Sequence, residues 1–203
     1  MRRVILLFAM TVNGRVDAMS DWFKDEAYSL AVDEMVHILD TCDTILLGRN
    51  TYNEFYPYWP DIFASSPADH ADDRIHPVAG AICDIEKVVV TRQTSPTALE
   101  WDSARFEPAS TDSEMRSLVE KLQGRPGGDI AVAGGVMLYK SLLRIGVVDE
   151  IRVIIAPSVS AGAGVFQDVV GTRDLDLLQV KSHTSGAVLL RYGFRSSDTV
   201  RRT

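Results

Sequence analysis

The sequence predicts an α/β fold built on a mostly parallel sheet. Short apolar runs alternate with stretches whose apolar residues recur at helical spacing, which is the pattern of strands connected by helices. Several runs are apolar without alternation, as expected of strands covered on both faces. The last two runs flank Ser185-Gly186 and predict an antiparallel hairpin. Together these observations predict three layers, with helices on both faces of a mixed sheet.

Composition excludes several classes of protein. The chain has 203 residues, 46% of them hydrophobic, and a net charge of −7, so we expect one domain over residues 1–203 and no nucleic-acid partner, which would need a basic surface. The apolar run at residues 4–10 is far shorter than a membrane span and lacks a signal-peptide pattern. We therefore expect no membrane association.

The cysteines and histidines argue against disulfides and metals. Cys42 and Cys83 are isolated, which favours a reducing cytoplasm. The histidines have no metal-ligand spacing, so we predict no metal site; they are His37, His70, His76 and His183.

In the first half, buried strands are predicted at residues 4–10, 44–48 and 87–91. A helix is predicted from Asp25 to Leu39, with one apolar stripe formed by Ala31, Met35, Ile38, Leu39 and Cys42. Arg49 to Tyr52 should turn into a short helix. Residues 56–77 contain four prolines and two polar pairs, which predicts a loop-rich surface insertion, carrying Tyr56, Tyr58 and Trp59 as loop anchors or as a lid. A short helix is expected at 78–85.

The second half alternates in the same way. We predict strands at 105–107, 130–133, 151–156, 175–180 and 187–192, and helices at 113–122 and 136–145. The stretch from Ile130 to Pro157 reads as one strand–helix–strand unit, with Gly146 ending the helix. Its crossover would be right-handed if the two strands were neighbours.

Gly134-Gly135 stands where a strand meets a helix. Free backbone N–H groups and the positive end of the helix dipole meet at such a point, so a phosphate could approach closely. The alternative is a tight turn that serves only packing. Both interpretations stay open from these two glycines alone.

Two further strand ends carry groups that bind anions. Arg49 and Thr51 follow one predicted strand, and Thr91-Arg92 ends another. Ligands of open α/β sheets bind beyond the carboxyl ends of the strands, and arginine can hold a phosphate through two hydrogen bonds. The combination favours a site for a dinucleotide with a pyrophosphate and a 2′-phosphate over a set of ordinary surface residues. The chain lacks both the G-x-G-x-x-G and the P-loop patterns.

These motifs resemble a known superfamily. Gly48-Arg49-Asn50-Thr51-Tyr52 looks like the G-R-x-T-[YW] motif of dihydrofolate reductase-like proteins, and Thr11-Val12-Asn13-Gly14-Arg15-Val16 resembles the turn after their first strand. The segment from Gly134 to Pro157 is similar to the reductase domain of the bifunctional riboflavin-biosynthesis deaminase/reductase and its stand-alone relatives. The likeness extends from about Val4 to Tyr192.

The resemblance implies a dihydrofolate reductase-like fold with an eight-stranded mixed sheet and an NADPH site. It places backbone of Ala9 and Val16 near the nicotinamide, and Thr91-Arg92 on the adenosine side. The phosphates would meet Gly48, Arg49 and Thr51. The pyrophosphate would lie against Gly134, Gly135, Val136 and Met137.

Candidate residues for the substrate side follow the first predicted strand. We expect Asn13, Asp17 and Trp22 there, with Trp22 and Phe23 stacking on a planar heterocycle or, alternatively, anchoring the loop. Asp25 is the first choice for a proton donor, with Asp21 and Glu26 nearby; a solvent-facing charge at the helix start is the competing interpretation of Asp25.

The chain departs from the family at two positions and in one motif. Asn13 replaces the usual Asp of the first turn, and Ala133 stands where the riboflavin-pathway reductases carry a Glu. The motif of the deaminase half is absent.

The resulting hypothesis is an NADPH-dependent reductase of a pterin-like or aminopyrimidine compound in riboflavin- or folate-type metabolism, similar to 5-amino-6-(5-phosphoribosylamino)uracil reductase or dihydrofolate reductase. The alternatives are a non-catalytic nucleotide-binding module and a flavin-binding protein that uses the same cleft. A homodimer is expected from the family.

Overall fold

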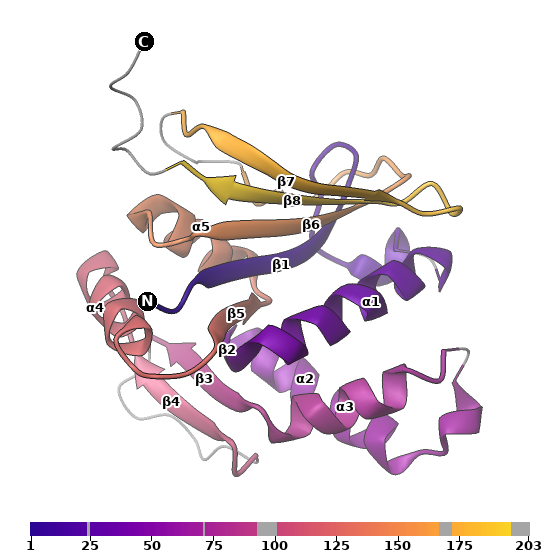
Figure 1. Ribbon diagram of the computed structural model, residues 1–203, viewed down its shortest axis with the longest axis horizontal. Helices are drawn as coiled ribbons and strands as arrows, with labels where there is room; N and C mark the ends of the chain where they lie inside the picture. The colour runs from indigo at the N-terminus through magenta and orange to yellow at the C-terminus, as the bar shows by residue number, and fades with distance from the viewer. Residues whose placement is uncertain (24, 71, 93–100, 167–171, 196–203) are drawn as a thin grey trace.

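An eight-stranded sheet forms the centre of the computed structural model, which describes residues 1–23, 25–70, 72–92, 101–166 and 172–195 (Figure 1). The strands are β1 (Val4–Thr11), β2 (Cys42–Gly48), β3 (Glu86–Thr91), β4 (Ala104–Pro108), β5 (Asp129–Ala133), β6 (Glu150–Ala156), β7 (Leu175–Ser182) and β8 (Val188–Phe194). Their order is β4-β3-β2-β5-β1-β6-β8-β7. The first six are parallel, and the hairpin of β7 and β8 is antiparallel, so the predicted mixed sheet and hairpin are confirmed.

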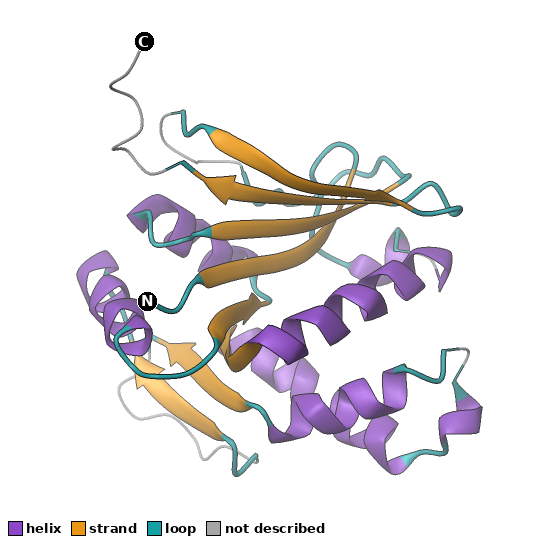
Figure 2. Cartoon of the chain, viewed as in Figure 1, coloured by secondary structure: helices purple, strands orange, loops and turns teal. Residues whose placement is uncertain are grey.

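Helices cover both faces of this sheet (Figure 2). They are α1 (Asp25–Thr41), α2 (Arg49–Ala64), α3 (Ile75–Asp84), α4 (Asp112–Gln123) and α5 (Val136–Ile145), with short 3-10 turns at Met19–Asp21 and Pro67–Asp69. α4 and α5 pack on one face, and α1, α2 and α3 share a second apolar cluster on the other. The three predicted layers are confirmed.

The apolar runs follow from burial on both faces. In β1, Val4, Leu6 and Phe8 belong to the cluster under α4 and α5, while Ile5 belongs to the cluster under α1 to α3. A strand with this environment needs apolar residues at every position. Burying one such side chain fully contributes about 1.5 to 3 kcal/mol.

The expected strand–helix–strand unit is present, but its two strands are not neighbours. β5 and β6 are parallel, and β1 lies between them and pairs with both. β1 supplies Val4, Ile5 and Leu6, whose exposed fraction is 0%. Such a strand is most stable when strands on both sides satisfy its backbone and helices cover both its faces.

The prediction of a loop-rich insertion at residues 56–77 is wrong over the first part of that range. α2 continues through Pro57 and Pro60 to Ala64. A proline inside a helix costs about 3 kcal/mol, but aromatic residues at helical spacing offset this cost by packing: Tyr52 and Trp59 are buried, and Phe55 and Tyr56 pack on the same cluster. The expected loop aromatics are therefore helical. α3 begins three residues before the expected start of that helix.

The buried face of α1 includes a charged residue that the expected apolar stripe did not contain. Ile38 is buried as predicted, and Leu30 and Val32 are buried as well. Glu34 lies among them at 4% exposure because its Oε1 accepts a 2.6 Å hydrogen bond from Arg152 of β6. The Nε of Arg152 donates to Glu150 at 2.7 Å, so the apolar contact between helix and sheet surrounds a buried ionic network.

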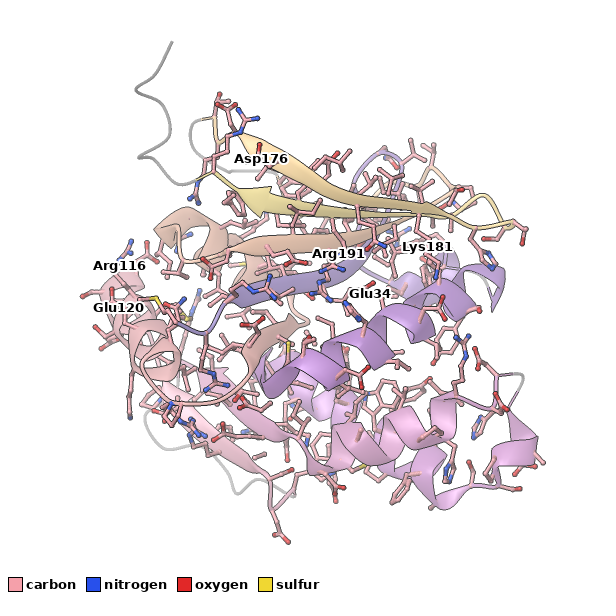
Figure 3. All side chains as sticks on the ribbon, viewed as in Figure 1. Glu34, Arg116, Glu120, Asp176, Lys181 and Arg191 are labelled. Atoms are coloured by element: carbon pink, nitrogen blue, oxygen red, sulfur yellow. The ribbon has the colours of Figure 1, made fainter. Side chains whose placement is uncertain are left out.

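The network extends toward the hairpin. Arg191 of β8 donates from Nε to Glu150 Oε1 at 3.0 Å, and Arg3 donates to the other oxygen of the same carboxylate at 3.0 Å. Figure 3 shows Glu34 on α1 and Arg191 on β8 on the same side of the sheet. The ionic contacts therefore join α1, β6, β8 and the start of β1.

Replacing Arg152 by Met should destabilise the protein strongly, since Glu34 would keep a buried charge without this partner. We expect the free energy of unfolding in urea to fall by about 3 to 5 kcal/mol. The double variant with Glu34→Met should recover part of that loss.

The matched control is Arg144→Met, which breaks a pair with Asp112 in which both side chains are about half exposed. It should change stability by about 1 kcal/mol or less. Equal losses of stability for Arg152→Met and Arg144→Met would show that breaking the buried network costs no more than breaking an exposed ion pair.

Candidate functional site

The candidate site lies at the carboxyl edge of the parallel strands. β3, β2, β5 and β1 are successive neighbours in the sheet, so the segments that follow Thr91, Gly48, Ala133 and Thr11 leave the sheet on the same side. This edge is where open α/β sheets bind ligands. The three strand ends singled out in the sequence are therefore brought together.

The glycine turn after β5 touches the start of α2. Gly134 and Gly135 have φ angles of +103° and +88°, which disfavour any residue with a Cβ. A Cβ on Gly134 would lie only 2.1 Å from Thr51 Cγ2 and 2.7 Å from Thr51 Oγ1. Both the backbone conformation and the available space thus require glycine at position 134.

Two helix N-termini converge at this contact. α2 begins at Arg49 and α5 at Val136. The residues at their N-caps, Gly48 and Gly135, have no side chain that could cap the first N–H groups. The first N–H groups of a helix lack acceptors within the helix, and the helix dipole makes this end positive. The arrangement suits an anion that lies across both helix ends.

A residue that sequence reasoning missed holds the turn in place. The N–H of Gly134 donates a 2.5 Å hydrogen bond to the hydroxyl of Tyr139, which donates in turn to the carbonyl of Leu7 at 2.8 Å. Burial raises the pKa of the Tyr139 hydroxyl, so it stays a neutral donor. Tyr139 stands five residues after Gly134, on the buried side of α5. This spacing was the feature of the sequence that could have indicated its contact with the turn.

One candidate arginine, Arg49, begins α2, and the other, Arg92, follows β3. The guanidinium carbon of Arg49 lies 4.7 Å from the centre of the Phe106 ring of β4, a stacked contact that orients the charged group. Thr91 is buried, whereas Arg92 is exposed and its carbonyl accepts from Ser110 Oγ at 3.3 Å. β3 and β5 lie on either side of β2. Thr91 and the glycine turn therefore lie at the ends of the two strands that flank β2.

Met137 and Val136 occupy the first turn of α5. Met137 is exposed and Val136 is half-buried. Their contact with a pyrophosphate stays a prediction.

The turn after β1 is fastened to the loop after β6. Asn13 Nδ2 donates to the carbonyl of Ser160 at 2.9 Å, and Asn13 Oδ1 accepts from the N–H of Ser160 at 3.1 Å. The N–H of Val16 donates to the carbonyl of Ala163 at 2.9 Å. Ala9 is buried at 7% exposure. The Asn13 side chain is therefore used in a contact between loops.

Asp17 and Trp22 form a second fastening. Arg15 donates to Asp17 at 2.8 Å and to Asp21 at 2.9 Å, and the hydrogen bond from Arg15 lowers the pKa of Asp17. Trp22 is 4% exposed, and its indole N–H donates to the carbonyl of Asp17 at 2.8 Å. This geometry favours the loop-anchor interpretation of Trp22; a substrate contact stays a prediction.

Of the candidate acids, only the side chain of Asp21 is described, and it accepts from Arg15. The backbone of Asp25 begins α1, but the side chains of Asp25 and Glu26 lie outside the described part of the chain. The catalytic assignment of Asp25 stays a prediction.

Within the described residues, no three His, Cys, Asp or Glu side chains are grouped to hold a metal ion. Nor does any described helix combine the length and apolarity needed to cross a bilayer. Desolvation raises the pKa of the Cys42 thiol to about 11, which makes this residue a poor nucleophile at neutral pH.

Comparison with known proteins identifies a family and a relative of similar length. Residues 2–190 match the model of the RibD C-terminal domain family. The uncharacterized protein YyaP of Bacillus subtilis (strain 168) is 27% identical over 195 residues, covering 94% of each chain.

Two solved structures share the fold. A pyrimidine reductase-like protein from Corynebacterium diphtheriae has a TM-score of 0.61 at 15% identity, over 97% of this chain and 93% of its own. Dihydrofolate reductase from Enterococcus faecalis, complexed with NADP(H), has a TM-score of 0.58 at 11% identity, over 96% of this chain and 97% of its own.

Replacing Gly134 by Ala should destabilise the protein by about 2 to 4 kcal/mol, because a left-handed backbone and an overlap with Thr51 add their costs. Gly14→Ala is the matched control, since Gly14 has φ +89° but a Cβ added there would meet nothing within 4 Å. The control should lose only the conformational cost, about 1 to 2 kcal/mol. Urea unfolding measures both, and equal losses would contradict a tight contact with Thr51.

Proposed function

Because the chain belongs to the RibD C-terminal domain family, we propose that it is an NADPH-dependent reductase. Its substrate would be a planar pterin-like or aminopyrimidine compound of riboflavin- or folate-type metabolism. The solved dihydrofolate reductase of the same fold is a complex with NADP(H), which supports the choice of cofactor.

One observation carries the proposal: the contact of Thr51 with Gly134, which brings the starts of α2 and α5 together. The glycine turn leaves a surface without Cβ atoms beside two positive helix ends, and a pyrophosphate fits both its charge and its close approach. In this proposal Gly48 and Thr51 bind from the α2 side, and Gly135, Val136 and Met137 bind through backbone from the α5 side.

The preference for NADPH over NADH rests on arginine. Arg49 follows β2, and Arg92 follows β3 in an exposed position. A guanidinium can form two hydrogen bonds with a phosphate and keeps its charge at any physiological pH. We assign Arg49 to the phosphates, including the 2′-phosphate, and Thr91-Arg92 to the adenosine side.

The reaction proposed is hydride transfer to a C=N or C=O group of the substrate. NADPH would supply the hydride, while the chain orients the reactants and excludes water. The end of β1, with Ala9 and the backbone of Val16, would lie along the nicotinamide. Ala133 is half-buried at the end of β5 and would offer an apolar surface to the substrate.

We assign the role of proton donor to Asp25 at the start of α1. A carboxyl group near an apolar pocket can be tuned to donate a proton at neutral pH. Its neighbour Asp21 is held by Arg15, which leaves Asp25 as the better candidate.

Polar groups tie the loops beyond the sheet edge to each other. Asn13 and Arg15 after β1 hold Ser160 after β6, and Arg15 also holds Asp17 and Asp21. These side chains have partners within the chain, so substrate recognition in this region would rely more on backbone and apolar surface.

A non-catalytic nucleotide-binding module is the second candidate. It is favoured by the use of Asn13, Asp17 and Asp21 in contacts within and between loops. A flavin-binding protein using the same cleft is the third. Purified protein separates them: yellow colour supports flavin, and NADPH binding without oxidation across pterin and aminopyrimidine substrates supports the non-catalytic module.

A cytoplasmic homodimer completes the proposal. β7 is the last strand of the sheet, and Leu177, Leu178 and Val180 are each more than half exposed, so a second copy could cover them. Cys42 and Cys83 are free thiols, consistent with a reducing compartment. Sedimentation of a monomer at micromolar concentration would contradict the dimer.

Replacing Arg49 by Ala should weaken NADPH binding by about tenfold or more, because a charge-assisted hydrogen bond contributes about 1.5 to 3 kcal/mol. NADH lacks the 2′-phosphate, so its affinity should fall much less. Titration of both nucleotides measures the difference, with Arg144→Ala on the exposed surface of α5 as the control. Equal losses for the two nucleotides would refute the assignment of Arg49 to the 2′-phosphate.

A further inference from the structure

The N–H of Gly134 is already used within the protein. It lies 2.5 Å from the hydroxyl oxygen of Tyr139, and that hydroxyl donates to the carbonyl of Leu7 at 2.8 Å. One phenol therefore connects the turn after β5 to the adjacent strand β1. A phosphate at this turn is offered the N–H groups after Gly134 rather than that of Gly134 itself.

Tyr139 is held firmly in this position. It is 4% exposed, and the centre of its ring lies 5.2 Å from that of Phe8. Burial raises the pKa of its hydroxyl, so the group stays protonated and can donate and accept at the same time. A buried hydroxyl with both bonds satisfied is a rigid link.

The same turn is also confined by Thr51. The side chain of Thr51 fills the space where a Cβ of Gly134 would lie. Tyr139 thus ties the turn to β1, and Thr51 sets the distance between the turn and α2. Movement of the turn away from Tyr139 would break a hydrogen bond, and movement toward Thr51 would meet its side chain.

We propose that Tyr139 is a positioning residue for the cofactor, which it serves by fixing the glycine turn to β1. This inference rests on the proposed function. The bond to Tyr139 aims the N–H groups of Gly135, Val136 and Met137 toward the pyrophosphate. Because Leu7 is two residues before Ala9 on β1, the same bond sets the pyrophosphate position relative to the nicotinamide position.

The link has a consequence for catalysis. Reacting atoms must be held closely aligned, and a displacement of about 1 Å can cost about 100-fold in rate. A turn released from β1 would weaken the contacts with the pyrophosphate and leave those with the adenosine end intact. This difference separates positioning from a general loss of structure.

The test is Tyr139→Phe, which removes the hydroxyl and keeps the ring. We expect NADPH affinity to fall about tenfold, while adenosine 2′-monophosphate, which has neither phosphate of the pyrophosphate, binds unchanged. Tyr52→Phe is the matched control: Tyr52 is 3% exposed, and its hydroxyl accepts from the N–H of Trp101 at 3.3 Å. The control should leave both affinities unchanged. Equal weakening of both ligands by Tyr139→Phe, or of neither, would overturn the proposal.

Hydrogen exchange separates failure of this inference from failure of the proposed function. If the wild-type protein binds no NADPH, the function fails, yet the link itself can still be measured. The Gly134 amide should exchange faster in Tyr139→Phe than in the wild type, with the Val132 amide unchanged. Should the variant not fold, the wild-type protein decides: exchange of the Gly134 amide at the rate of an unstructured peptide would disprove the link.

Discussion

The close approach of Thr51 to Gly134 is the contact on which the candidate site depends. It exists because β2 and β5 are parallel neighbours, so that the helices after them start at the same edge. It requires a residue without a Cβ, since a Cβ would lie 2.1 Å from Thr51. Two positive helix ends are thereby held side by side, which neither helix could achieve alone.

The elements that hold this edge are stabilised differently on the two faces. Under α4 and α5 the contact is apolar, with Leu118, Leu122 and Leu142 packed on the sheet. Under α1 the apolar contact surrounds Arg152, Glu34 and Glu150. Buried ion pairs add little stability relative to apolar residues of the same volume, but removing one partner is costly. Such a network favours one position of α1 on the sheet, and α1 carries the proposed proton donor.

Local sequence determined most of the secondary structure and the residue types at the three strand ends of the candidate site. Continuous apolar runs marked the central strands, and the glycines at 134 and 135 marked a turn into a helix, because these properties depend on a few adjacent residues. The Arg49–Thr51 motif was recognisable for the same reason. Where local signals competed, as with Pro57 and Pro60 against the aromatic stripe of α2, packing against α3 and the sheet decided the outcome.

Only the tertiary structure decided which distant residues meet. The insertion of β1 between β5 and β6, the burial of Glu34 and the bond between Tyr139 and Leu7 each join residues more than 100 positions apart in the sequence or depend on such a pairing. Their free energy comes from burial and hydrogen bonds that exist only once the sheet has formed. The sequence alone therefore determined the parts of the site, and the order of the strands determined their contact.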